Sequence, residues 1–259
     1  MGIRTLRVLA VFVPGVVASL ASAETIALHP SADATLLEVN PNNSSGGAEF
    51  FNAGTTQNRT RNRALLRFDV ASALPPGAQV TSATLQLEVV RSPKDGFEVG
   101  LFGLHPMLQS WGEGSSVPTD NAGGLGAPSM PGDATWMHRF AFTDLLWGEP
   151  GGEAGVDYAA PASSSTFIYS TGAYQFEGTL DLVRDVQGWL DNPNANFGWM
   201  LMTEMEEVNF TARRFASRED PSGGPFLFLE YTVVPEPGVF VLSALGIAVA
   251  VACRRLKPR

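Results

Sequence analysis

The residues most able to do chemistry are spread thinly along this 259-residue chain. The three histidines, His29, His105 and His138, are far apart, and none belongs to a His-x-x-x-His pair that could hold zinc on one helix face. The one cysteine, Cys253, stands near the C-terminal end, so the preceding chain offers no thiol nucleophile and no disulfide. A Gly-x-Ser-x-Gly elbow is also missing. Carboxylates and aromatic rings are therefore the remaining candidates, and we interpret His105, at the end of an apolar run, as a buried structural residue.

Glu204, Glu206 and Glu207 form the densest acidic group. We interpret this group as a solvated strand end or turn, because exposure is the ordinary fate of glutamate. Two carboxylates brought together by folding are nonetheless sufficient for glycoside hydrolysis. A secreted glycoside hydrolase or lyase using paired carboxylates therefore stays open as the alternative function.

Sugar binding would require flat aromatic rings that can stack on a pyranose. Trp136 and Trp147 lie in a glycine-rich segment and are the candidates, with anchoring of that segment as the alternative role. Trp189 and Trp199 stand in apolar patterns and are predicted to be in the core.

Calcium would require several oxygen ligands from loops. Residues 191–196 (DNPNAN) supply such side chains, but they lack the glycine and the glutamate of an EF-hand loop and fit a helix-ending turn better. A structural Ca²⁺ ion therefore stays possible, with its ligands unassigned.

The elements that would position these residues are mainly β-strands. Short apolar or alternating runs are separated by clusters of Gly, Pro, Asn and Asp, which favours an antiparallel β-sandwich over alternating β and α units. In the clearest run, residues 81–90, Leu85, Leu87 and Val89 would face inward while the polar residues between them face outward. The predicted strands are residues 35–39, 48–53, 63–70, 81–90, 99–105, 197–202, 209–215 and 226–233.

Two stretches depart from the strand pattern. Residues 179–190 carry apolar residues at helical spacing, with Thr179 as N-cap and Asn192-Pro193 as the stop, and predict one short helix. Residues 109–165 are rich in Gly, Pro, Ser and Asp, and a connection of that length is typical of a functional or flexible segment.

The N-terminal end has the three zones of a secretory signal peptide. Arg4 and Arg7 precede a short apolar run over residues 8–20, and Ala21 and Ala23 then stand at the −3 and −1 positions that signal peptidase accepts. Residues 1–23 are therefore predicted to be a removable signal helix, with the mature chain beginning at Glu24.

The C-terminal end combines a motif, an apolar span and a basic tail. Val234, Pro235, Glu236 and Pro237 precede an apolar run over residues 238–252 that would reach about 22 Å as a helix. The basic residues of the tail that follows would stay in the cytoplasm. The three parts, over residues 234–259, resemble the PEP-CTERM sorting signal. The resemblance implies transient association with the inner membrane and removal of the tail by exosortase, a membrane-embedded cysteine transpeptidase. An ordinary membrane anchor is the alternative.

Several segments of the intervening residues 24–233 resemble the DNRLRE-type family, which is related to disaggregatase repeats and to a class of carbohydrate-binding modules. The matching segments are 33–35 (DAT), 63–69 (RALLRFD), 81–85 (TSATL), 110–113 (SWGE), 185–189 (DVQGW), 197–199 (FGW) and 215–219 (FASRE). The resemblance implies one all-β domain, a jelly-roll-like antiparallel sandwich with one short helix. It also makes Asp33 a candidate metal ligand.

The charge of this body limits its partners. Six of the 17 Lys and Arg lie in the two predicted signals, against one of the 26 Asp and Glu, so the body would carry a net charge of −14. Such an acidic surface excludes nucleic acid, whose phosphates need a basic footprint. The sequence thus predicts a cell-surface or extracellular-matrix protein that is non-catalytic, part of a biofilm, and either structural or bound to exopolysaccharide.

Overall fold

The computed structural model describes residues 22–94, 98–119 and 124–233, and its compact unit extends from Ala23 to Val233. The predicted signal helix with Ala21, and the predicted sorting segment with Val234, Pro235, Glu236 and Pro237, lie outside the described residues. Among the residues that are described, no helix is long and apolar enough to cross a membrane.

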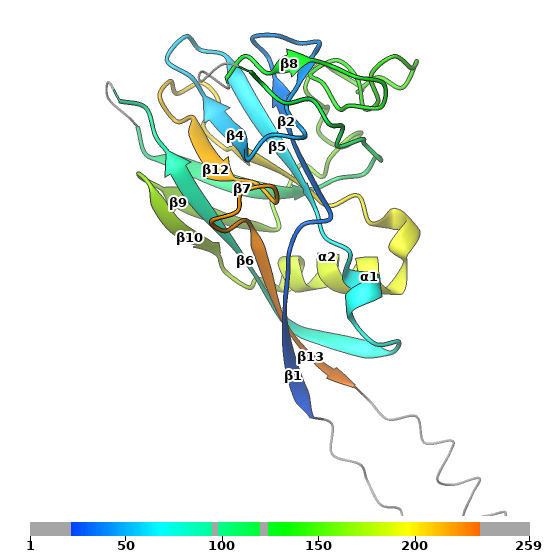
Figure 1. Cartoon of the computed structure of the whole chain (residues 1–259). Helices are drawn as coiled ribbons and strands as arrows, with labels where there is room; N and C mark the ends of the chain where they lie inside the picture. Colours follow the sequence, from blue (N-terminus) through cyan, green and yellow to red (C-terminus); the bar gives the residue numbers. More distant parts are fainter. Residues whose placement is uncertain (1–21, 95–97, 120–123, 234–259) are drawn as a thin grey trace, which may run out of the picture. The chain divides into compact units, whose positions relative to one another are not determined.

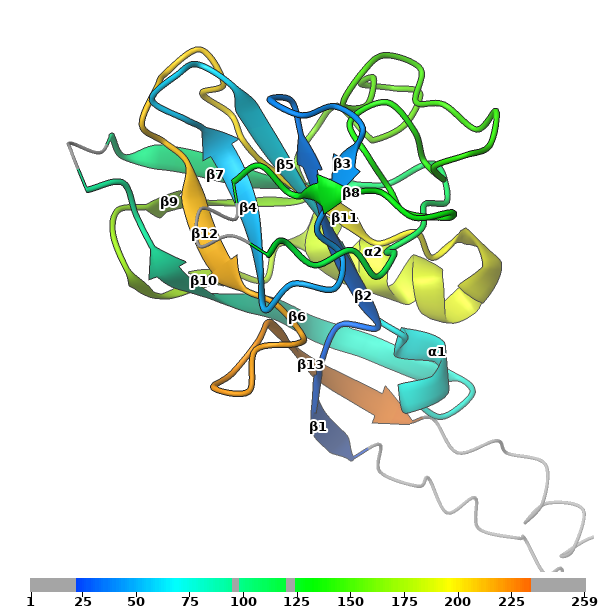
Figure 2. The same ribbon diagram turned by 45° about the horizontal axis from the view of Figure 1, so that its top comes forward.

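The body is an eleven-stranded antiparallel sheet that curls on itself (Figures 1 and 2). We name its two parts after their central strands. The β6 half contains β1 (Ala23–Leu28), β6 (Ala78–Arg91), β10 (Gly172–Phe176), β12 (Arg213–Ala216) and β13 (Phe226–Val233). The β5 half contains β2 (Ala32–Leu37), β5 (Arg61–Arg67), β7 (Gly100–Pro106), β9 (Ser164–Ile168) and β11 (Trp199–Thr203). Strand β4 (Phe50–Thr55) pairs with both β12 and β5 and joins the halves.

The predicted alternation of β6 is confirmed. Leu85, Leu87 and Val89 are fully buried in the main apolar core, while Thr84, Gln86 and Glu88 between them are partly exposed. All eight predicted strands are present with boundaries that shift by a few residues. One correction concerns the end of β5, which stops at Arg67, so that Val70 begins a short helix, α1 (Val70–Ala73), capped by Asp69.

The predicted helix is confirmed as α2 (Leu180–Asp191). The hydroxyl of Thr179 accepts a hydrogen bond from the Leu182 amide at 3.0 Å and caps its first turn. A 3₁₀ turn (Pro193–Ala195) follows. Trp189 of α2 and Trp199 of β11 pack with ring centroids 4.4 Å apart in the main core, as predicted.

The long segment between β7 and β9 lies at the end of the body away from β1 and β13 (Figures 1 and 2). Among its described residues, the one named strand is β8 (Ala127–Pro128), which pairs with β3 (Asn43–Ser44). Its buried aromatic residues form a second apolar cluster against the outer side of the β5 half, made of Trp111, Trp136, Trp147 and Tyr158 with Leu36, Leu65 and Met200. The segment therefore folds as part of the body and covers one side of the sheet.

Candidate functional site

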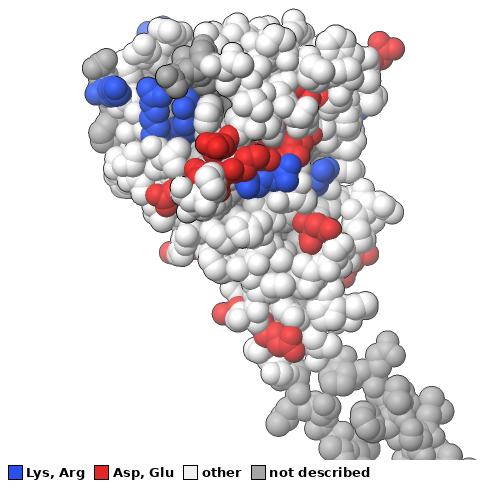
Figure 3. Space-filling model, viewed as in Figure 1, with Lys and Arg blue, Asp and Glu red and all other residues white. Residues whose placement is uncertain are grey.

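Three carboxylates from distant parts of the chain meet beside β2. Asp33 belongs to β2, Glu113 to the segment after β7, and Glu219 to the turn after β12. One carboxylate oxygen from each lies within 4.8 Å of the others. We name Asp33, Glu113, Glu219 and the neighbouring Arg218 the acidic cluster. In the view of Figure 3, acidic and basic side chains lie side by side across the middle of the molecule.

Hydrogen bonds set the geometry of the acidic cluster. The Asp33 amide donates to Glu113 Oε1 at 2.9 Å, and the Arg218 amide donates to Asp33 Oδ2 at 2.8 Å. The Arg218 guanidinium binds both carboxylate oxygens of Glu113, at 2.6 and 3.0 Å, and lies 2.9 Å from Glu219. Gly46 packs directly against the Glu113 carbonyl, where a Cβ atom would collide. The loop that carries Glu113 can therefore approach this closely only because residue 46 is glycine.

Burial dominates the electrostatics of Asp33, which is only 2 % exposed. Desolvation raises the pKa of its carboxyl from 3.8 to about 8; the charges of Glu219 and Glu113 add to the rise, and the Arg218 amide opposes it. Desolvation also raises the pKa of Glu219, whose Oε2 atom is buried and has no hydrogen-bond partner among the residues that the structure describes. At neutral pH and without a bound cation, this raised pKa favours the protonated form of the Asp33 carboxyl.

The fit of the acidic cluster to Ca²⁺ is partial. Three carboxylates are the hard oxygen ligands that Ca²⁺ prefers, and a bound cation would ionise Asp33. Ca²⁺ takes about six to eight oxygens, however, and the Arg218 guanidinium already bridges Glu113 and Glu219. The structural Ca²⁺ thus stays a prediction, with Asp33, Glu113 and Glu219 as the residues that would hold it.

Glu113 and Glu219 were not predicted as partners of Asp33. No spacing rule connects positions 33, 113 and 219, because strand β2 and the two loops that carry these residues come together only in the folded sheet. The one signal in the sequence was indirect, since all three residues fall in segments that carry the DNRLRE resemblance.

The two tryptophans proposed for sugar stacking are both buried. Trp136 is 3 % exposed, and its ring lies 5.1 Å from the guanidinium carbon of Arg61 and 5.6 Å from that of Arg63. Trp147 is 5 % exposed and donates its indole N–H to the Thr135 carbonyl at 2.8 Å. Neither indole face is open to a sugar ring. Both side chains are buried as expected for residues that anchor the long segment.

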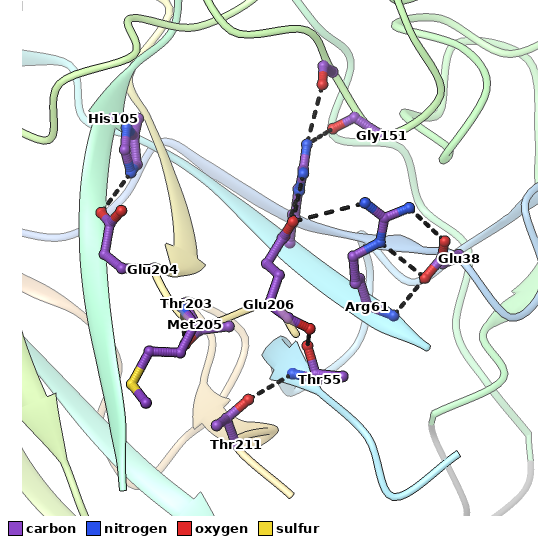
Figure 4. A network of polar contacts seen from close by, with 12 residues as sticks. Glu38, Thr55, Arg61, His105, Gly151, Thr203, Glu204, Met205, Glu206 and Thr211 are labelled. Carbon is purple, nitrogen blue, oxygen red and sulfur yellow. Dashed lines mark hydrogen bonds and ion pairs between the residues drawn. The ribbon is translucent and has the colours of Figure 1, made fainter. Parts of the chain in front are cut away.

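The acidic group lies in a turn after β11, as predicted, and Glu207 is exposed there, but Glu204 and Glu206 belong to a polar network (Figure 4). Glu206 accepts two hydrogen bonds at 2.8 Å from the buried guanidinium of Arg63, which also binds the carbonyls of the loop glycines Gly151 and Gly152. The interpretation of Glu206 as solvated was therefore wrong, because Arg63 on β5 needs a carboxylate to neutralise its charge.

The second pair in the network joins Glu204 to His105. Nε2 of His105 lies 2.9 Å from Glu204 Oε1 (Figure 4). The other ring nitrogen, Nδ1, lies 3.0 Å from the Ala159 carbonyl oxygen. His105 is 1 % exposed, as expected for a structural residue, and Gly103 leaves the space in which the two side chains meet. Arg63 of β5 and His105 of β7 thus each contact a glutamate and also a backbone carbonyl of the long segment. These contacts connect the long segment to the sheet.

The fold and these contacts define an antiparallel β protein with an acidic cluster at its surface. No protein-family model matches the chain, and no curated protein matches it.

Proposed function

We propose that this chain is an exported cell-surface or extracellular-matrix protein, processed at both ends, whose body binds polysaccharide or serves as a structural component of a biofilm. Signal peptidase and exosortase would act on its two ends during export. The body would be a jelly-roll-like β-sandwich, a proposal supported by the main apolar core that fills the space between the β6 and β5 halves.

The observation that carries this proposal is the pairing of the first and last strands. β1 and β13 are antiparallel neighbours from Ala23 opposite Thr232 to Leu28 opposite Leu227. Glu24, the expected first residue after cleavage, accepts a hydrogen bond from the Tyr231 hydroxyl at 2.8 Å. Cutting before Glu24 and after Val233 would therefore remove only the exposed Ala23 from β1 and leave the rest of the sheet and the apolar core in place.

The intact mass of the exported protein tests the processing. We expect a chain that begins at Glu24 and ends close to Val234–Pro237, and a variant with Pro235→Ala and Pro237→Ala should keep the tail. If Arg259 is still present in the exported wild-type protein, the segment is a membrane anchor and exosortase processing is refuted.

Affinity electrophoresis against the producer's exopolysaccharide, with and without Ca²⁺, tests the binding function. Retardation of the protein by the polysaccharide is expected. An unretarded protein on neutral, acidic and amino-sugar polymers alike would refute polysaccharide binding and leave the purely structural role.

One observation favours the enzymatic alternative. Asp33, whose pKa burial raises to about 8, lies beside the Arg218-bound Glu113, and a carboxyl group with a raised pKa is what the general acid of a glycoside hydrolase requires. Against it, Asp33 is only 2 % exposed, whereas a general acid must reach the glycosidic oxygen of its substrate. Assays for reducing sugars and unsaturated products on a glycan panel decide the matter, and product formation that Asp33→Asn abolishes would establish the enzyme.

A further inference from the structure

The two halves of the sheet differ in what covers their outer sides. On the β5 half, the second apolar cluster, with Trp111, Trp136 and Trp147, packs over β2, β5 and β11. Among the described residues, no comparable cluster covers the outer side of β1, β13 and β6. We name this side the open face and define it by the outward side chains Phe226, Phe228, Glu230, Thr84, Gln86 and Glu88.

The strand register places aromatic and polar side chains next to one another on the open face. Phe226 lies opposite Gln86 and Phe228 opposite Thr84. The two phenylalanine rings are stacked with centroids 6.0 Å apart, and His29 packs against Phe226 at 4.4 Å. Phe228 is 41 % exposed, although burial would stabilise a side chain of its size by about 2 kcal/mol. The face therefore offers a short aromatic platform flanked by hydrogen-bonding groups.

Two shallow hollows lie along the open face. One of about 410 Å³ is lined by Phe228 and Glu230 together with residues of β1 and β6. The other, of about 360 Å³, is lined by Phe226, Gln86 and Glu88 together with residues of the turn before β13. Since neighbouring residues of β13 and β6 line both hollows, the pair could hold consecutive units of an extended chain.

The charge of the open face indicates the kind of chain. Glu230 lines the first hollow, while Glu88 and Asp220 line the second. Among the described residues that line either hollow, none is Lys or Arg. In Figure 3 the charged groups toward the β1 and β13 end are likewise acidic. Such a face repels polyuronates and other anionic glycans, and it attracts ammonium groups.

We infer that the open face binds a polysaccharide of amino sugars that carry free amines. The rings of Phe226 and Phe228 would stack on the apolar faces of pyranose units, as aromatic rings do with flat apolar surfaces. Glu88, Glu230 and Asp220 would accept hydrogen bonds from the ammonium groups, and Thr84 and Gln86 from the sugar hydroxyls. This inference rests on the proposed polysaccharide-binding function and names the surface and the ligand class for it.

Binding of the purified full chain to a short glucosamine oligomer tests the inference, measured by calorimetry at low and moderate salt. A neutral glucose oligomer and a polyuronate are the comparison ligands. We expect Phe228→Ala to weaken glucosamine binding about tenfold, the effect of truncating one well-packed aromatic contact. Glu230→Gln should weaken it severalfold and reduce its salt dependence, because one attractive charge is lost.

Matched controls separate the open face from general effects. Phe167, on β9, is 54 % exposed, and Glu149 is exposed on the long segment, so Phe167→Ala and Glu149→Gln should bind as the wild type does. A circular-dichroism melt of each variant verifies folding.

The outcomes distinguish this inference from the function on which it rests. If the wild type binds glucosamine oligomers and folded Phe228→Ala binds them equally well, the assignment of the binding site to the open face is refuted, while polysaccharide binding stands. Preference for the neutral oligomer or the polyuronate would overturn the amino-sugar assignment. A wild type that binds none of the three refutes the proposed binding function itself. A wild type that is a dimer and becomes monomeric on Phe228→Ala would instead assign the open face to a second copy of the chain.

Discussion

Replacing Asp33 by asparagine should make the protein more stable at neutral pH. The Asp33 carboxyl has a folded-state pKa of about 8 against 3.8 for the free side chain. Its contribution to stability is therefore fully present below pH 4 and is lost as the pH rises toward 8. Each pKa unit corresponds to about 1.36 kcal/mol. At pH 7, about three pKa units above the unshifted value of 3.8, the stability contribution that has been lost is roughly 4 kcal/mol.

Asparagine matches the protonated carboxyl in shape and is neutral at every pH. Its side-chain oxygen can still accept the hydrogen bond from the Arg218 amide, and its NH₂ group can donate toward Glu113 or Glu219. We therefore expect Asp33→Asn to raise the free energy of unfolding by about 2 to 4 kcal/mol at pH 7 to 8, and to leave it nearly unchanged near pH 4.

Urea denaturation in EDTA, repeated from pH 4 to pH 8.5, measures this difference. Asp144→Asn, at an exposed position in the long segment, is the control and should give a curve parallel to that of the wild type. A loss of stability in Asp33→Asn of equal size at pH 4 and pH 8 would refute the reasoning, because it would mean that Asp33 acts only through its shape and hydrogen bonds.

The remaining predictions concern calcium, the polar network, the loop anchors and the helix cap. Added Ca²⁺ should stabilise the wild type but not Asp33→Asn if the acidic cluster holds the ion, and a melting temperature unchanged by Ca²⁺ would contradict the structural Ca²⁺. Glu206→Gln should lower the free energy of unfolding by about 3 kcal/mol in urea titrations, since it leaves the Arg63 charge buried without a carboxylate, and an effect below 1 kcal/mol would contradict that view. Trp136→Ala should cost about 3 to 5 kcal/mol of stability while the folded fraction keeps its glycan affinity, whereas a selective loss of affinity would restore Trp136 as a stacking residue. Thr179→Ala should cost about 1 kcal/mol, and Thr179→Ser, which keeps the capping oxygen, much less.

The elements that could be predicted are those whose signals are local. The alternation along β6 and the capped apolar pattern of α2 can each be read from residues that are close together in the sequence. Apolar residues repeat every second position in β6 and every three to four positions in α2. Strands β1, β9 and β10 were missed. Their outward residues are exposed at both edges of the sheet, so their sequences lack a sustained apolar alternation. These strands exist because a neighbouring strand supplies their hydrogen bonds, as β13 does for β1.

The roles of individual carboxylates could not be predicted in this way. Asp33 and Asp220 are both acidic residues near predicted turns, yet Asp33 is buried with a raised pKa while Asp220 lines a surface hollow. Glu206 and Glu207 are adjacent, but only Glu206 reaches the Arg63 guanidinium. The difference depends on which strand or loop packs above each side chain.

The sequence by itself determined the all-β class, the inward face of β6, the helix, and the tryptophans of the main core, because each follows from the period of apolar residues along one segment. Only the tertiary structure decided that the long segment covers the β5 half and buries Trp136 and Trp147. It also decided that positions 33, 113 and 219 meet in one acidic cluster, and that the β6 half keeps an open face. These outcomes depend on contacts between residues far apart in the chain, and such contacts leave no periodic trace in a single sequence.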